Sequence, residues 1–125
     1  MKAEGREPEV VRLRRIYDEP EDDDGIRVLV DGLWPRGVSK ARADLDEWCT
    51  AVAPSAELRS WYAHDPARFA EFADRYRREL DDPERASALR HLRDLAAGHR
   101  ITLLTATKNP ETSQAAVLVE LLRSS

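Results

Sequence analysis

The sequence contains only one cysteine, Cys49, among 125 residues. A single thiol forms neither an internal disulfide nor a cysteine-rich zinc site, so both kinds of scaffold are excluded. A lone thiol suits a reducing compartment, and the expected location is therefore cytoplasmic. Because Cys49 follows Trp48 within an expected helix at residues 44–50, we interpret it as a small buried side chain rather than as a nucleophile.

Long apolar runs are also missing from the chain. No stretch approaches the roughly 18 apolar residues of a membrane-spanning helix, and residues 1–9 carry charge without the apolar segment of a signal peptide. No membrane partner is expected. These nine residues have too little apolar surface to offset the entropy of ordering, which predicts a flexible tail. Residues 10–125 are then long enough for one domain with one core.

The chain has no excess of positive charge. Its 20 Lys and Arg and 24 Asp and Glu give a net charge of −4, which provides no general attraction to nucleic acid or anionic lipid. Direct DNA binding is further disfavoured because the helical patterns between residues 44 and 62 are acidic. The acidic run at residues 22–24 lacks the ligand spacing of a calcium-binding loop, so it predicts a solvated turn of mutually repelling carboxylates.

Three short segments have the composition of strands. Residues 26–30 and 101–105 are almost continuously apolar, as in strands that are buried on both faces of a parallel sheet. Residues 10–17 mix aliphatic side chains with arginines, which suits an edge strand. Helical patterns lie between and after these segments, at residues 44–50, 56–62, 66–80, 83–97 and 110–123.

The boundaries of these helices carry their own signals. Asp65, Asp82 and Asn109 each precede a proline and are expected to cap a helix at its N-terminus, and Gly98 suits the position after a helix. Strands that alternate with helices predict an α/β fold: a small, mainly parallel sheet with helices on its faces, in a single domain.

The segment DGLWPRGVSK, residues 31–40, follows a predicted strand and is the first candidate site. Ligands collect at the carboxyl ends of strands in open α/β sheets. Arg36 can bind a carboxylate or phosphate through two hydrogen bonds, and Lys40 adds a mobile charge. We interpret the loop as an anion site, with Trp34 as anchor and ligand contact and Asp31 orienting Arg36. A purely structural alternative stays open: Trp34 fills the core and Arg36 forms an ion pair with Asp31.

Two further positions are candidates for chemistry. Lys108 follows a buried strand and precedes a helix N-terminus, where a bound anion is favoured, although it can equally be a simple exposed lysine. His64 lies in a loop and is a candidate for proton transfer together with Asp31, or it packs against Trp61. No histidine pair has metal-ligand spacing, so no metal is predicted, and the sequence names no other cofactor.

Several quoted segments resemble a known family. RVLVDGLWPRGVSK, DEW, APSAELRSWYAHDP, RYRREL and ITLLTATKNPE occur in the order of YeaO-like proteins, a branch of the domain-of-unknown-function 488 family. The resemblance runs from about Leu13 to Leu122. It implies a compact cytoplasmic bacterial α/β domain whose biochemical role is unassigned.

The chain departs from this family pattern at four positions. Gly32 stands where relatives usually have arginine, Asn109 where they have an acidic residue, and Thr112 and Ser113 where they tend to have His-Asn. If the His-Asn pair takes part in chemistry or metal binding in relatives, this chain lacks it.

The expected function is the binding of an anionic small molecule, with or without catalysis. The alternative is a non-catalytic regulatory or interaction module, which would present its basic residues as an exposed stripe instead of converging them on a pocket. The sequence leaves the ligand, the reaction and the oligomeric state open.

Overall fold

Four parallel strands form the sheet, in the order β1-β4-β2-β3. The inner strands are β2 (Ile26–Leu29) and β4 (Ile101–Thr105), and every side chain of β4 is buried. β1 (Val11–Arg15) and β3 (Glu47–Trp48) are the edges. The computed structural model describes residues 10–124, so the predicted tail at residues 1–9 lies outside the described residues. The predicted α/β class, the two buried inner strands and the arginine-bearing edge strand are confirmed.

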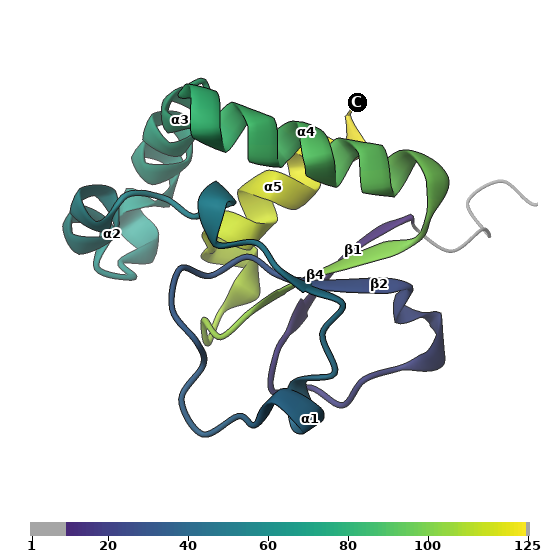
Figure 1. Cartoon of the computed structure of the whole chain (residues 1–125). Helices are drawn as coiled ribbons and strands as arrows, with labels where there is room; N and C mark the ends of the chain where they lie inside the picture. Colours follow the sequence, from purple (N-terminus) through teal and green to yellow (C-terminus); the bar gives the residue numbers. More distant parts are fainter. Residues whose placement is uncertain (1–9, 125) are drawn as a thin grey trace, which may run out of the picture.

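The helices lie on both faces of the sheet, as predicted. α3 (Phe69–Glu79), α4 (Pro83–Gly98) and α5 (Gln114–Arg123) cover one face, with α2 (Ala56–Tyr62) beside them, and the short α1 (Lys40–Ala43) lies at the other (Figure 1). No helix in the described part of the chain is both long and apolar enough to cross a membrane.

The capping aspartates behave as their sequence context predicts. The carboxylates of Asp65 and Asp82 accept hydrogen bonds from backbone N–H groups in the first turns of their helices. Asn109 differs, because its side chain makes no capping bond. The last helix is capped instead by the hydroxyl of Ser113, which accepts a hydrogen bond from the N–H of Ala115. The final helix therefore begins four residues later than predicted, after a 3-10 turn at Pro110–Thr112.

The core between the sheet and the large helical layer is rich in aromatic contacts. Phe72 and Tyr76 of α3 are almost completely buried, and the ring of Phe72 stacks on that of Tyr62 at 4.3 Å between centroids. The hydroxyl of Tyr76 donates to the carbonyl of Val52. These contacts fix α2 and α3 relative to the ends of the strands.

The helix predicted at residues 44–50 is wrong. This segment runs along the edge of β2, where the N–H of Asp46 donates to Arg27 O at 2.9 Å and the N–H of Cys49 donates to Leu29 O at 2.8 Å. The spacing of its apolar residues is helical, but hydrogen bonding to the open strand edge overrides that local preference. Cys49 is buried, as predicted, and burial raises the pKa of its thiol.

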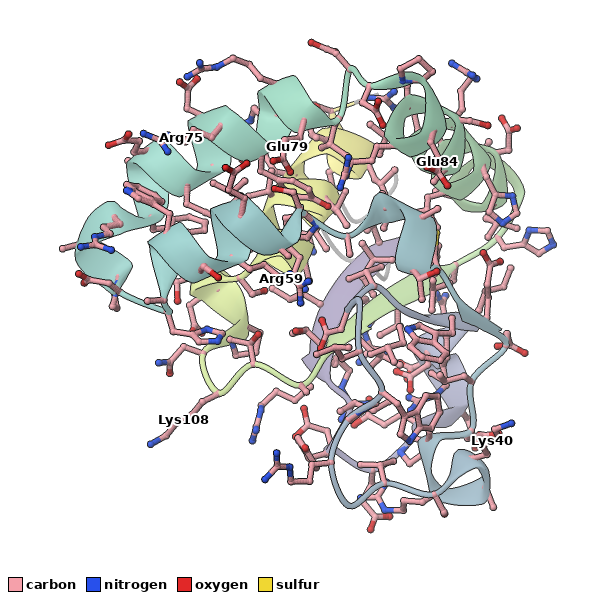
Figure 2. All side chains as sticks on the ribbon, turned by 60° about the vertical axis from the view of Figure 1, so that its left-hand side comes forward. Lys40, Arg59, Arg75, Glu79, Glu84 and Lys108 are labelled. Carbon is pink, nitrogen blue, oxygen red and sulfur yellow. The ribbon has the colours of Figure 1, made fainter. Side chains whose placement is uncertain are left out.

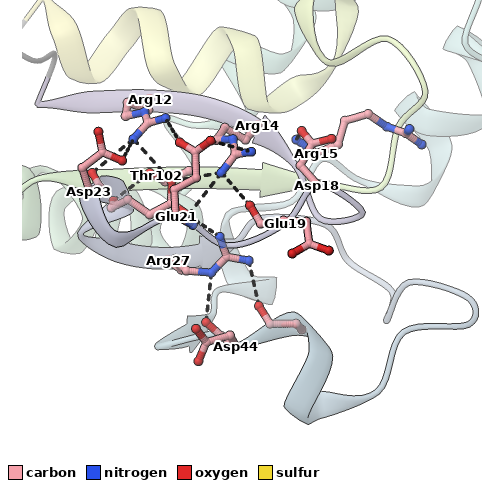
Figure 3. Close-up of polar contacts among 12 residues, drawn as sticks. Arg12, Arg14, Arg15, Asp18, Glu19, Glu21, Asp23, Arg27, Asp44 and Thr102 are labelled. Atoms are coloured by element: carbon pink, nitrogen blue, oxygen red, sulfur yellow. Dashed lines mark hydrogen bonds and ion pairs between the residues drawn. The ribbon is translucent and has the colours of Figure 1, made fainter.

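The second face of the sheet carries a network of ion pairs (Figure 3). Arg12 and Arg14 of β1 and Arg27 of β2 surround the carboxylate of Asp24, which is 1% exposed and lies 2.5 Å from Arg27. The prediction of a solvated acidic turn is therefore wrong for Asp24. Burial alone would raise the pKa of Asp24, but hydrogen bonds from Glu21 N–H and Arg27 and the charge of Arg14 lower it.

Candidate functional site

A pocket of about 390 Å³ opens at the carboxyl ends of β2 and β4. Its walls come from the loop after β2, from α2 and the turn that follows it, and from the segment between β4 and α5. The lining residues are Tyr17, Asp31, Gly32, Leu33, Trp34, Pro35, Arg36, Pro54, Arg59, Tyr62, His64, Phe72, Ala106, Thr107, Ser113 and Gln114. Segments that are distant in sequence therefore meet at the edge where α/β folds commonly bind ligands.

Asp31 is tied into the inner wall of the pocket. Its Oδ1 accepts hydrogen bonds from the Thr105 hydroxyl at 2.8 Å and from the Gln114 amide at 2.6 Å, and its Oδ2 accepts one from Ala106 N–H at 2.8 Å. Burial raises the pKa of Asp31, an effect that these three hydrogen bonds and the charge of Arg59 oppose. The expected Asp31–Arg36 ion pair does not form, since no such contact exists in residues 10–124.

The loop that carries Arg36 is held by three aromatic side chains. The Tyr17 hydroxyl donates to Arg36 O at 3.0 Å, the Trp34 indole to Val38 O at 2.6 Å, and the Trp48 indole to Asp31 O at 2.8 Å. Trp34 also packs against the smaller apolar cluster on the second face of the sheet. Trp34 thus anchors the loop as predicted and lines the pocket at the same time.

Arg36 lines this pocket with an exposed side chain. Within the described residues its guanidinium makes no hydrogen bond or ion pair; only its backbone carbonyl is engaged, by Tyr17. The guanidinium is therefore available to a ligand.

Arg59 is the pocket cation that the sequence analysis missed. It projects from α2 toward the ends of the strands (Figure 2), and its Nη1 would lie 3.8 Å from a Cβ placed on Gly32. Its guanidinium also has no hydrogen-bond partner among residues 10–124. One signal was available: Arg59 lies three residues before Tyr62 in a predicted helix, which places both on one face.

His64 lies at the rim, in a strained turn after α2. Ala63 and His64 have φ values of 50° and 57°, a left-handed region that is uncommon for residues other than glycine. The His64 ring lines the pocket 6.3 Å from the Tyr62 ring centroid, and in the described chain it has no hydrogen-bond partner. The structure thus brings together four of the six predicted site residues, Asp31, Trp34, Arg36 and His64.

Lys40 and Lys108 do not line the pocket. Lys40 begins α1 and Lys108 lies in the loop after β4, and both are exposed. Figure 2 shows them at separate corners of the molecule, pointing outward. Their predicted role as ligand contacts gains no support from this placement.

The described residues include one group of carboxylates close enough to share a metal ion, Glu21, Asp23 and Asp24. These carboxylates already form ion pairs with Arg12, Arg14 and Arg27, and none of them lines the pocket. The group is explained by its arginine partners.

Comparisons with known proteins give the family. A family model described as "Inactive DUF488-N3 subclade" matches residues 10–125. The chain belongs to this family. It is 49% identical over 112 residues to the uncharacterized protein Rv3073c of Mycobacterium tuberculosis, covering 90% of this chain and 92% of that protein.

A second relative confirms the predicted resemblance to YeaO-like proteins. The chain is 40% identical over 114 residues to the uncharacterized protein YeaO of Escherichia coli, covering 91% of this chain and 97% of YeaO. No solved structure matches the chain.

Proposed function

We propose that this protein binds a small organic anion in the pocket at the ends of β2 and β4, and that it does so without converting the ligand. The observation that carries the proposal is that two guanidinium groups in the wall of one pocket, Arg36 and Arg59, make no hydrogen bond or ion pair with the described residues.

Arginines elsewhere in the fold provide the contrast. Arg27 binds Asp24, Arg75 binds Glu71 and Arg77 binds Glu120, so carboxylates commonly satisfy this chain's guanidinium groups. The two pocket arginines make no hydrogen bond or ion pair with a carboxylate within residues 10–124, although the charge of Arg59 acts on Asp31. Guanidinium groups form strong, planar pairs with carboxylates and phosphates, and a ligand with such a group supplies what these two side chains lack.

Two observations favour binding without turnover. Asp31, the partly buried carboxylate of the pocket, is held by three hydrogen bonds. His64 has no side chain of the described residues to orient it, although a proton-transfer pair normally includes such a partner. The family that matches the chain is also described as an inactive subclade.

The interaction-module alternative is less well supported. It requires a continuous basic stripe on the surface, whereas Arg36 and Arg59 come from different segments and line the same cavity. Convergence on a concave site with apolar walls is typical of small-molecule binding.

The test is a thermal-denaturation screen of the wild type, Arg36→Ala and Arg59→Ala against inorganic phosphate, acetate, benzoate and adenosine monophosphate. Ligand at a hundredfold excess over its dissociation constant stabilises the native state by about 2.7 kcal/mol. We expect at least one anion to stabilise the wild type and to stabilise either variant much less. The matched control is Arg90→Ala, since Arg90 is an exposed arginine of α4 outside the pocket.

Two outcomes would contradict the proposal. One is equal stabilisation of all four proteins, which would show a non-specific salt effect. The other is the absence of any stabilisation of the wild type by every anion tested. If NMR of the ligand over a day showed that a bound anion is converted, the claim that the pocket lacks turnover would be overturned.

A further inference from the structure

The charges of the pocket leave a surplus of one positive charge. Arg36 and Arg59 contribute two positive charges, and an ionised Asp31 contributes one negative charge. Arg59 already acts on Asp31, because its charge opposes the rise in the pKa of that carboxyl. A ligand with one negative charge therefore neutralises the pocket. A second negative charge would face Asp31 in the inner wall.

This balance favours a carboxylate over a phosphate monoester. A phosphate monoester has a second pKa near 6 and so carries almost two charges at neutral pH. A carboxylate carries one charge, and its planar pair of oxygens matches the two parallel N–H groups of a guanidinium.

Most of the remaining wall is apolar or aromatic, and Thr107, Ser113 and Gln114 are its uncharged polar residues. Four large hydrophobic side chains are exposed in the described residues, and two of them, Tyr17 and Leu33, line this pocket, with Leu33 70% exposed. Single exposed leucines need no explanation, but Leu33 adjoins the pocket wall formed by Trp34 and Tyr62. Apolar and aromatic side chains beside the charged groups of a pocket suit a ligand whose body is itself an apolar ring.

We infer that the ligand of this pocket is an aromatic monocarboxylate, with its carboxylate between Arg36 and Arg59 and its ring against Leu33 and Tyr17. This inference rests on the proposed function and adds the class of ligand. The cavity of about 390 Å³ is at the small end of ligand pockets, which suits one or two fused rings.

The experiment is an NMR titration of the whole chain with four matched probes: acetate, 2-naphthoate, naphthalene-2,3-dicarboxylate, whose second charge lies beside the first, and naphthalene-2-carboxamide. We expect 2-naphthoate to bind at least tenfold more tightly than acetate and than the neutral carboxamide. We expect the dicarboxylate, which keeps the ring and adds a charge, to bind at least threefold more weakly than 2-naphthoate.

Two substitutions separate the ring contact from the charge contact. Leu33→Ser alters an exposed side chain, so the fold tolerates it, and we expect it to weaken 2-naphthoate at least threefold while leaving acetate unchanged. Val10→Ser is the matched control, because Val10 is also exposed but lies outside this pocket. It should leave the affinity for both probes unchanged.

The outcomes distinguish this inference from the proposed function. Equal affinity for acetate and 2-naphthoate, both lost in Arg36→Ala, would overturn the aromatic ligand and leave the anion site standing. Tighter binding of the dicarboxylate than of 2-naphthoate would overturn the single-charge argument alone. Equal binding of the carboxamide and 2-naphthoate, unaffected by Arg36→Ala and Arg59→Ala, would overturn both proposals.

Discussion

The side-chain amide of Gln114 donates a 2.6 Å hydrogen bond to the carboxylate of Asp31, across 83 residues of sequence. This bond joins the first residue of α5 to the residue that follows the buried segment of β2. With the Thr105 hydroxyl on the same oxygen, it ties two strands and a helix together at the inner wall of the pocket.

Removing the Gln114 amide should destabilise the fold. Gln114→Ala leaves Asp31 Oδ1 with one donor fewer in a partly buried site, so we expect the free energy of unfolding at pH 7 to fall by about 1–2 kcal/mol. Urea denaturation with an unchanged m-value measures this loss. Asn109→Ala is the control, because Asn109 is an exposed amide whose side chain makes no capping bond; a loss as large in that variant would refute the assignment.

The pKa of Asp31 should lie above the ordinary aspartate value of about 3.9, because burial disfavours its charged form. Asp31 therefore contributes stability that is fully present below about pH 4 and is lost as the pH rises through its raised pKa in the folded state. Carbon NMR of the Asp31 carboxyl measures the value. Arg59→Ala removes an opposing charge and should raise it further, whereas Arg90→Ala should not change it.

Asp24 should have the opposite dependence on pH. The hydrogen bonds and charges around Asp24 lower its pKa, although burial alone would raise that pKa. Its contribution to stability is present above about pH 4 and is lost as the pH falls through the folded value. We expect Asp24→Asn to cost about 3 kcal/mol at pH 7, as when one partner of a buried ion pair is removed, and to flatten the acid limb of a stability–pH curve.

The neighbouring carboxylate provides the control for this prediction. Asp23 is exposed and pairs with Arg12 at the surface, so Asp23→Asn should cost less than about 1 kcal/mol. Equal losses in the two variants would mean that the buried network contributes no more than a surface ion pair.

Gly25 should tolerate no side chain. Its φ is +69°, and a Cβ there would lie 2.1 Å from the carbonyl oxygen of Arg100, which accepts a hydrogen bond from Ile26 N–H. We expect Gly25→Ala to lower the free energy of unfolding by about 3 kcal/mol through strain and overlap. Gly98→Ala, at an open position of α4, should be neutral or stabilising by up to about 1 kcal/mol. Thermal unfolding of both variants decides the comparison.

Local pattern predicts most of the elements, because burial and capping leave traces in neighbouring residues. The inner strands and the helices after Asp65 and Asp82 are examples. The helix prediction for residues 44–50 was wrong because their partner, the edge of β2, lies nearly twenty residues earlier in the chain. Pairing at that distance leaves no mark on the local spacing of apolar residues. The prediction that Asp24 lies in a solvated turn was wrong for the same reason, because the arginines that neutralise its carboxylate lie on two strands.

Apart from His64, the residues of the site were predicted only where one loop carries them. The segment around Asp31 and Arg36 is contiguous, so its residues stand out together. Arg59 comes from a helix rich in polar residues, and only the packing of α2 beside the strand ends separates it from other exposed arginines. Lys40 and Lys108 carry the right charge, but the direction of each side chain depends on the loop conformation.

The central position of β4 determines when this protein can fold as it is made. β4 lies between β1 and β2, yet it comes near the end of the chain, and β1 reaches it across about ninety residues, from Val11 to Ile101. A nascent chain that ends before Ile101 has no strand for β1 to pair with and lacks Thr105 and Gln114 for Asp31. The apolar faces of the first strands therefore stay exposed until the segment from Ile101 to Gln114 has left the ribosome, an interval in which aggregation competes with folding.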